Sequence, residues 1–312
     1  MAITQGTLGT GRVGLKKLFA IESDKVEKQY IDVVGRIDKT DQTAEVYKQY
    51  AGLGPATATP EGNKVDYDDL VPLYVAAFKP LMYSKGVKFS KQAAYTDQYN
   101  KLKTLTPDIA RSFVQRRNLY TADLDNSGFT DTSRGMNTEP LYSASHSMGS
   151  FYGNNRPLAP GQVAGPSAVT LDLAFGPLAL EQAWSDLRRQ KSARNLPMFP
   201  LGKLDIKVPP ELYMQALRAL RSLKLPGTNN NDENVVREKF NAPTVIDYYT
   251  SATAWFVKAA DTAYHGLFFL EQMPYDIEEL PPDDEIMRKW IAYESYIAGW
   301  YDWHGTYGTL GA

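Results

Sequence analysis

EVYKQYAGLG (45–54), PATATPEGNK (55–64) and VDYDDLVPLYVAAF (65–78) form two β-leaning limbs around a turn rich in proline, glycine and threonine. Prolines in the turn and at Pro72 remove backbone donors, which confines the limbs to the edge of any sheet. The pattern predicts a long hairpin. Because an isolated two-stranded hairpin is marginally stable, we expect its order to come from a neighbouring molecule. The residues expected to make this assembly contact are Tyr47, Tyr50, Tyr74 and Phe78.

The region before the hairpin reads as an arm and not as a domain. Residues 1–43 are rich in glycine at first and then charged, and their single β-like run is YIDVV at Tyr30–Val34. Such an arm cannot bury its few apolar residues alone, so it also requires a partner.

After the hairpin, the sequence predicts a strand and then a long amphipathic helix. The strand-like stretch is Leu81–Phe89. The helix is expected to begin with Thr106 as its N-cap and Pro107 at its first position. Its apolar residues recur near one face: Ile109, Phe113 and Tyr120.

The second half mixes helix and strand signals, which predicts an α+β fold. A loop-rich segment at residues 123–168 precedes it. The expected elements are a helix from Pro177, a strand at Leu204–Val208, a helix at Glu211–Leu223, strands at Pro243–Tyr249, Ala254–Ala259 and Gly266–Glu271, and a long aromatic segment near the C-terminus. The tryptophans expected in the structural core are Trp255, Trp290, Trp300 and Trp303.

Composition excludes several classes of protein. The 312 residues include 34 lysines and arginines against 36 aspartates and glutamates, a net charge of −2, which argues against an overtly basic nucleic-acid binder. The chain has no cysteine, so disulfides, thiolate metal sites and a thiol nucleophile are excluded. No run of 18 uninterrupted apolar residues indicates a membrane span, and Met1–Leu18 lacks the apolar region of a secretory signal.

Two short motifs match binding loops only in part. GTGRVG (9–14) has the glycine spacing of a dinucleotide loop, but a buried strand does not precede it, so a flexible arm is the favoured interpretation. DLDNSG (123–128) opens like a calcium loop, but Arg134 stands where the bidentate glutamate belongs, which favours a helix exit. The histidines His146, His265 and His304 are scattered, and a structural role is expected for each.

Three arginines on the long helix, Arg111, Arg116 and Arg117, leave two interpretations open. They could face the phosphates of DNA, although arginines on an amphipathic helix more often form a solvated or ion-paired face. Elsewhere the sequence offers no nucleophile elbow, Walker loop or kinase motif set. We therefore expect no catalysis, no cofactor and no metal.

The order of these pieces resembles the major capsid proteins of tailed phages, in particular the Mu-like major head subunit branch of the Hong-Kong-97-type fold. The stretches that carry the resemblance are NTEPLYSASH (137–146), KLDIKVPPELYMQALRALRS (203–222), NNDENVV (230–236), AWFVKA (254–259) and YIAGWYDWHGTYG (296–308). They follow in family order over about 170 of the 312 residues. The first 60 residues match no family pattern, so the arm and loop assignments rest on order alone.

The resemblance implies a division of the chain into five parts: an N-terminal arm (1–43), an extended loop (44–80), a peripheral domain with a spine helix (81–169), an axial domain (170–285) and a C-terminal return to the peripheral domain (286–312). It also implies self-assembly into the pentamers and hexamers of an icosahedral head. The implied partners are a separate scaffolding protein, the portal, a decoration protein and packaged double-stranded DNA held by weak non-specific contact. The location would be the virion, after assembly in the host cytoplasm.

Two other classes of function stay open from the residues alone. One is an enzyme that uses the glycine-rich start or the central α/β block, and the other is a monomeric binding module with tyrosine-rich loops. The size of the particle separates them, because an assembly of hundreds of copies fits only the shell.

Overall fold

The computed structural model describes residues 21–90, 101–136, 138–143, 146, 173–194, 196–197, 202–224, 233–280 and 287–311. The helices are α2 (Gln29–Val34), α4 (Lys101–Asn126), α5 (Pro177–Arg189) and α6 (Pro210–Arg221), with short 3-10 turns η1 (Val235–Glu238) and η2 (Thr262–Tyr264). The strands are β1 (Ile37–Lys39), β2 (Glu45–Tyr50), β3 (Pro72–Phe78), β4 (Leu81–Ser90), β5 (Leu204–Val208), β6 (Thr244–Val245), β7 (Trp255–Ala259), β8 (Leu267–Leu280), β9 (Met287–Trp300) and β10 (Thr306–Thr309). This mixture confirms the α+β class.

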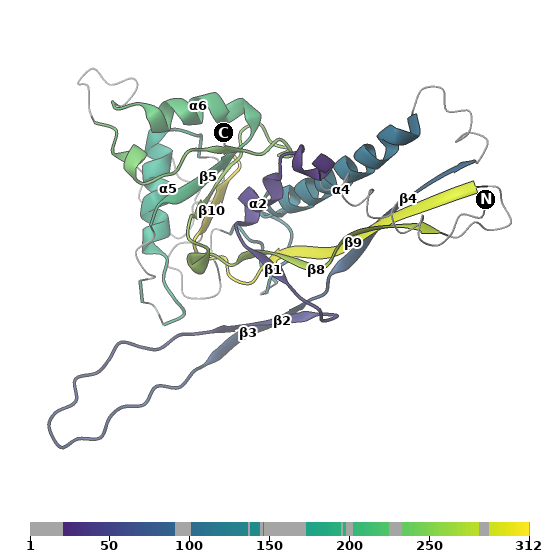
Figure 1. Ribbon diagram of the computed structural model, residues 1–312. Coiled ribbons are helices and arrows are strands. Elements are labelled where there is room, and N and C mark those ends of the chain that lie inside the picture. Colours follow the sequence, from purple (N-terminus) through teal and green to yellow (C-terminus); the bar gives the residue numbers. More distant parts are fainter. Residues whose placement is uncertain are drawn as a thin grey trace.

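One sheet, called here the long sheet, has the strand order β1-β8-β9-β4. Its central strands β8 and β9 are 14 residues each, and α4 runs beside them (Figure 1). Strand β8 was expected to end near Glu271, but it continues to Leu280 because β9 pairs with it along its length. The pairing register between β8 and β9 shifts on both sides of Met273. Pro274 lies in this irregular stretch, and because proline is unusual inside a strand, the sequence here does not look like one.

A second sheet, called here the compact sheet, has the order β10-β7-β5-β6 and is covered by α5 and α6 (Figure 1). Alternation along β5 positions it: Leu204, Ile206 and Val208 enter the core under the helices, so the intervening Asp205 and Lys207 take the opposite face. That opposite face points toward the C-terminal end of α4, because Lys207 donates a hydrogen bond to Asp125 at that end of the helix. The predicted strand Leu204–Val208 and helix from Pro177 are confirmed.

The run YIDVV forms helix α2, so the expected strand at Tyr30–Val34 is wrong. Its buried residues Tyr30, Val33 and Val34 follow helical spacing and pack in the core beside α4. Gly35 then ends the helix with φ 74°, a left-handed conformation that glycine adopts without strain. Burial of one helical face outweighs the β preference of adjacent valines.

Two other boundaries differ from expectation. Helix α4 begins at Lys101, so Pro107 lies inside it and Thr106 is not its cap. The upstream run KLKTL is rich in helix formers, which carries the helix through the proline. At Pro243–Tyr249 only Thr244–Val245 is strand, since the chain then turns and directs Tyr249 toward α4.

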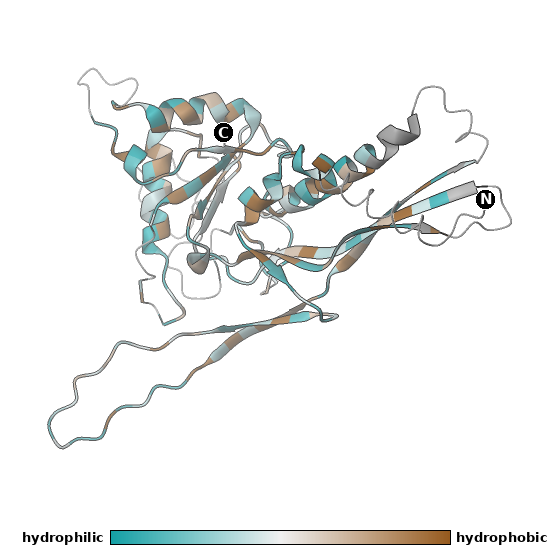
Figure 2. Cartoon of the chain, viewed as in Figure 1, coloured by the Kyte–Doolittle hydropathy of each residue, from teal (hydrophilic) through white to brown (hydrophobic). Residues whose placement is uncertain are grey.

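The predicted hairpin is confirmed, because β2 and β3 pair antiparallel with Glu45 opposite Phe78. It leaves the middle of the molecule in one direction, whereas β4 leaves in the other (Figure 1). Residues 51–71 join the two strands as a long loop that stands away from the body of the chain. From here on the name extended loop is kept for these residues, and the part of 44–80 that pairs as β2 and β3 is called the hairpin base. Figure 2 shows apolar residues along both limbs of the extended loop.

Candidate functional site

The base of the hairpin is fixed to its own chain by an aromatic cluster. Tyr47 stacks on Phe268 and Tyr301 with ring centroids 4.8 and 5.3 Å apart, and its hydroxyl donates to Asp38 over 3.1 Å. Phe78 is 5% exposed and packs edge-on against Phe268 at 4.8 Å. The expectation that Tyr47 and Phe78 contact a neighbour is therefore corrected. Strand β8 offers an aromatic surface directly under the hairpin, so the inward-facing rings are used within the chain.

The other two hairpin residues, Tyr74 and Tyr50, differ in how far they are exposed to solvent. Tyr74 is half-buried against the same cluster, so it too serves the base. Tyr50, at the outer end of β2, remains 46% exposed and is the only one of the four expected contacts that stays available to a neighbour.

The extended loop carries exposed apolar side chains and a local clasp. Asp68 accepts a hydrogen bond from the Gly54 backbone N–H over 2.6 Å, which ties the two limbs together. Arg194 donates to the Asp68 carboxylate over 2.8 Å and to the Asp69 carbonyl over 3.0 Å. The Gly54 N–H and then Arg194 hold the pKa of Asp68 below its usual range. The exposed apolar residues of the loop are Leu53, Val65, Tyr67, Leu70 and Val71.

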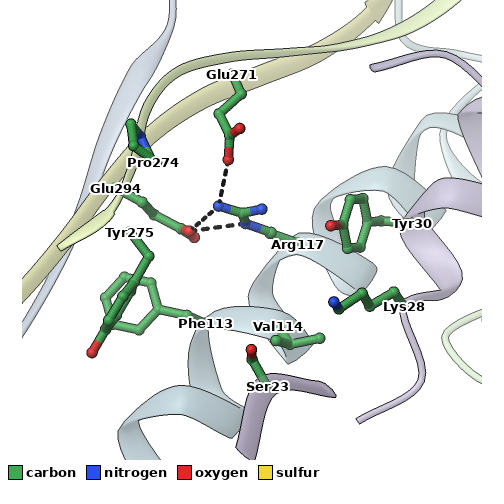
Figure 3. A pocket seen from close by; sticks show the side chains of 10 residues that line it. All are labelled: Ser23, Lys28, Tyr30, Phe113, Val114, Arg117, Glu271, Pro274, Tyr275 and Glu294. Carbon is green, nitrogen blue, oxygen red and sulfur yellow. Dashed lines mark hydrogen bonds and ion pairs between the residues drawn. The ribbon is translucent and has the colours of Figure 1, made fainter. Parts of the chain in front are cut away.

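Arg117 lies inside the molecule and not on a DNA-facing surface, which corrects that assignment. Its guanidinium donates to Glu294 Oε2 over 2.8 and 2.6 Å and to Glu271 Oε1 over 3.0 Å. Figure 3 shows the guanidinium between the two carboxylates in a cleft of about 310 Å³ that Tyr30 and Phe113 also line. Helical spacing put Arg117 on the polar side of α4, but the long sheet supplies acidic partners for that position.

The ion pair is largely shielded from water, with the Arg117 and Glu271 side chains 14% and 15% exposed. Glu294 is 1% exposed, and burial raises its pKa, an effect that Arg117 opposes. Burial works against the charge on Arg117 as well, yet Glu294 and Glu271 raise its pKa above the ordinary value. Arg117 therefore stays charged, and its hydrogen bonds to Glu294 and Glu271 fasten α4 to the long sheet.

The remaining two arginines of α4 are exposed. Arg111 pairs with Glu22 at 3.4 Å and with Asp108 at 3.8 Å. Arg116 lies with its guanidinium carbon 5.2 Å from the ring centroid of Tyr83 and 5.8 Å from that of Tyr120. Both arginines are thus held in place by their own chain while facing solvent.

A buried carboxylate joins the end of α4 to the compact sheet. Asp125, at the end of α4, accepts hydrogen bonds from Lys207 over 2.6 Å, from Tyr142 over 2.6 Å and from Tyr249 over 2.5 Å. Burial, and then the Asp125 charge, raise the pKa of both tyrosines. Since every partner is a donor, Asp125 is satisfied without an ion, and its neighbour Asp123 pairs with Arg134. The calcium-like spacing therefore reflects a helix end, as the sequence favoured.

Next to this joint lie two further buried basic side chains, Lys258 and His265. Burial and then Lys207 lower the pKa of Lys258 to about 8, and burial and then Lys258 lower the pKa of His265 to about 3. His265 is 3% exposed, and neither ring nitrogen has a hydrogen-bond partner among the described residues. His265 is therefore neutral at physiological pH.

The tryptophans occupy the positions expected of core residues, with one exception. Trp255, Trp300 and Trp303 are buried, whereas Trp290 is half-buried at the far end of the long sheet. His146 and His304 both stack on Trp303, each with ring centroids 4.0 Å apart.

Sequence analysis missed the joint formed by Asp125 and Lys207. A usable signal was present, because LDIKV puts two charges at alternate positions of an otherwise apolar strand. That alternation indicates a charged face, but it does not say that the face is buried or which carboxylate meets it. The residues around Glu271 and Glu294, the acidic partners of Arg117, show no comparable pattern in the sequence.

Three sequence features lie wholly or partly outside the described residues: the glycine motif at 9–14, most of the loop at 123–168 and part of NNDENVV. Within the described ranges, no group of three or more histidine, aspartate or glutamate side chains is placed to hold a metal ion. None of the described helices combines the length and apolar character that crossing a bilayer requires.

Comparison with known proteins gives one family and several structural neighbours. The family model described as phage capsid protein matches residues 75–308. A virus-like particle from Pyrococcus furiosus is similar with TM-score 0.54 and 10% identity, covering 95% of this chain and 97% of that chain. Microbacterium phage Oxtober96 gives TM-score 0.55 and 8% identity, with 92% of each chain covered. The mature capsid of bacteriophage PhiM1 is similar with TM-score 0.50 and 12% identity, covering 88% of this chain and 85% of that chain. No curated protein matches.

Proposed function

The chain belongs to the phage capsid protein family and is a major capsid protein of the Hong-Kong-97-type fold, and on this premise we propose that its copies assemble as pentamers and hexamers into an icosahedral phage head. The extended loop carries the proposal. It exposes apolar side chains, Tyr67 at 88% among them, that no part of its own chain covers among the described residues. Exposed apolar surface of this kind marks an interaction site.

The two sheets support a division into domains. The long sheet with α4 would form the peripheral domain, with α4 as the spine helix, and the compact sheet with α5 and α6 would form the axial domain around ring centres. Under this division β8 joins the peripheral domain, and the C-terminal return includes β9 but not β10, which pairs in the compact sheet. The proposed boundaries thus move from those that the sequence suggested.

The partners other than self follow from the same proposal. A separate scaffolding protein, the portal and a decoration protein would meet the shell, and packaged double-stranded DNA would touch its inner face weakly, in keeping with a net charge of −2. The protein would act in the virion after assembly in the host cytoplasm, without catalysis of its own, as part of the Mu-like branch.

Electron microscopy of the purified protein tests this function. Expression, together with a scaffolding protein where one is needed, should yield closed shells or tubes containing hundreds of copies. A protein that stays monomeric at high concentration, at every salt concentration tried and with the scaffold present, would contradict the proposal.

A further inference from the structure

A turn that follows α5 reaches from the compact sheet to the extended loop of the same chain. Lys191 pairs with Pro197 as an isolated bridge, so the chain reverses between them. Arg194 lies in this turn and donates to the Asp68 carboxylate over 2.8 Å and to the Asp69 carbonyl over 3.0 Å. Figure 1 shows the chain after α5 running toward that loop. The part of the turn from Lys191 to Arg194 is called here the strut.

The inner end of the strut is fixed to the connection between β9 and β10. The Gly305 N–H donates to Gln190 Oε1 over 2.8 Å, immediately before the strut begins. His304, which is 5% exposed, places its Nε2 3.1 Å from the Lys191 carbonyl oxygen, while its Nδ1 bonds to the Asp302 carboxylate. Because this connection joins the long sheet to the compact sheet, the strut starts where the two sheets meet.

Both ring nitrogens of His304 face groups that accept hydrogen bonds. A backbone carbonyl has no proton to donate, and an ionised carboxylate has none either. Both contacts are therefore hydrogen bonds only when each nitrogen carries a proton, which makes the ring an imidazolium. Burial works against this charge, yet Asp302 and then the Lys191 carbonyl raise the pKa of His304 above its ordinary value.

The surroundings of His304 also favour the charged ring. The titratable residues near it come from its own connection, from the strut and from the segment behind the Trp303 ring: Asp302, Lys191, Glu139 and His146. His304 stacks on one indole with ring centroids 4.0 Å apart, and an aromatic face attracts a cation. The carboxylate that bonds to the ring is on the same short connection, so it stays beside the ring when the strut moves.

We infer that protonated His304 holds the strut and, through Arg194, fixes the direction of the extended loop, and that loss of this proton frees the loop to move about the hairpin base. A neutral ring keeps its single proton for the Asp302 carboxylate. The lone pair of Nε2 then faces the Lys191 carbonyl oxygen and repels it. The strut loses its fixed inner end, so Arg194 no longer holds Asp68 in one place.

The direction of the pH dependence follows from the raised pKa. The bond to the strut is complete at about pH 6.5 and below, and it is lost as the pH rises through the pKa of the folded chain. One consequence rests on the proposed function: a loop of fixed direction loses less entropy when it meets a neighbouring subunit. Assembly should therefore be favoured on the acid side of that pKa.

Spin-label distances in the unassembled subunit test this device. The chain has no cysteine, so Ala56→Cys beside the clasp and Arg218→Cys on α6 place one label on the extended loop and one beside the compact sheet. The label-to-label distance should be narrowly distributed at pH 6 and broadly distributed at pH 9. Arg194→Met should give the broad distribution at both pH values, whereas the matched Arg237→Met should behave as the wild type does.

A second variant tests the proton itself. Asp302→Asn removes the charge that stabilises the imidazolium, so the distribution should broaden at a lower pH than in the wild type. The chain has three histidines, and an NMR titration of their rings reads the His304 proton directly. A control pair of labels at Glu181→Cys and Arg218→Cys, on the two helices over the compact sheet, should keep one distance in every variant.

Two outcomes would overturn the inference. Equally broad distributions at pH 6 in the wild type and in Arg194→Met would mean that the strut does not fix the loop. A wild-type distribution that stays narrow through the pH at which the His304 ring titrates would remove the role of the proton. Both results come from unassembled chains, so they leave the proposed function intact, whereas failure to form any shell contradicts that function alone.

Discussion

Arg117 and Arg116 are neighbours in sequence, yet the structure gives them different roles. Arg117 lies between Glu294 and Glu271 with its side chain 14% exposed, whereas Arg116 is exposed over aromatic rings. Removing one partner of a buried ion pair leaves an uncompensated charge, which costs about 3–5 kcal/mol. Arg117→Met should therefore lower the free energy of unfolding by about that amount, and the matched Arg116→Met by less than about 1 kcal/mol. Chemical denaturation measures both.

The Arg117→Met variant should also acquire a pH dependence. Burial already raises the pKa of Glu294, and without Arg117 this pKa rises further. The unfolded chain then releases the Glu294 proton at a lower pH than the folded chain does, so stability falls as the pH rises above about 4.5. We expect the deficit relative to wild type to be larger at pH 8 than at pH 5. An equal deficit at both values would show that Glu294 does not depend on Arg117.

His265 should make the subunit sensitive to acid. Its folded pKa is about 3, against 6.5 for the free side chain, so the unfolded chain binds a proton first as the pH falls. The contribution of neutral His265 to the free energy of unfolding is complete above about pH 6.5. It decreases as the pH drops, by about 3 kcal/mol at pH 4.5. His265→Phe removes the titrating group while keeping a ring, and its unfolding free energy should change less between pH 7 and pH 4.5. Equal losses in both proteins would contradict this account.

At the scale of elements, the hairpin divides into a base that belongs to the fold and a tip that belongs to assembly. Replacing Gly54–Asn63 with a short turn removes only one hydrogen bond to Asp68, so the melting temperature of the monomer should stay nearly unchanged while shells fail or become aberrant. Phe78→Ala, in contrast, empties a buried site at the base and should cost about 3–5 kcal/mol.

Calorimetry of the monomers and electron microscopy of the assemblies separate the two effects. Normal shells from the protein with the shortened tip would remove the assembly role of the extended loop. A sharp loss of melting temperature in that protein would mean that the tip, like the base, supports its own subunit.

At the scale of the whole molecule, the sequence alone determined those helices and strands whose signals lie within a few consecutive residues. Proline, glycine and alternating apolar residues specified the hairpin, β5 and the start of α5, because turn chemistry and strand periodicity act over a few residues. The order of these elements also sufficed to indicate the capsid family, and it placed Trp255, Trp300 and Trp303 in the core.

Only the tertiary structure decided which surface each element meets. YIDVV became a helix because α4 covers one of its faces, and Tyr47 and Phe78 turned inward because β8 carries aromatic residues beneath them. Arg117 and Asp125 found their partners on strands 82 to 177 residues away. Burial and long-range pairing outweigh local preference by several kcal/mol, and neither can be read from residues close in sequence.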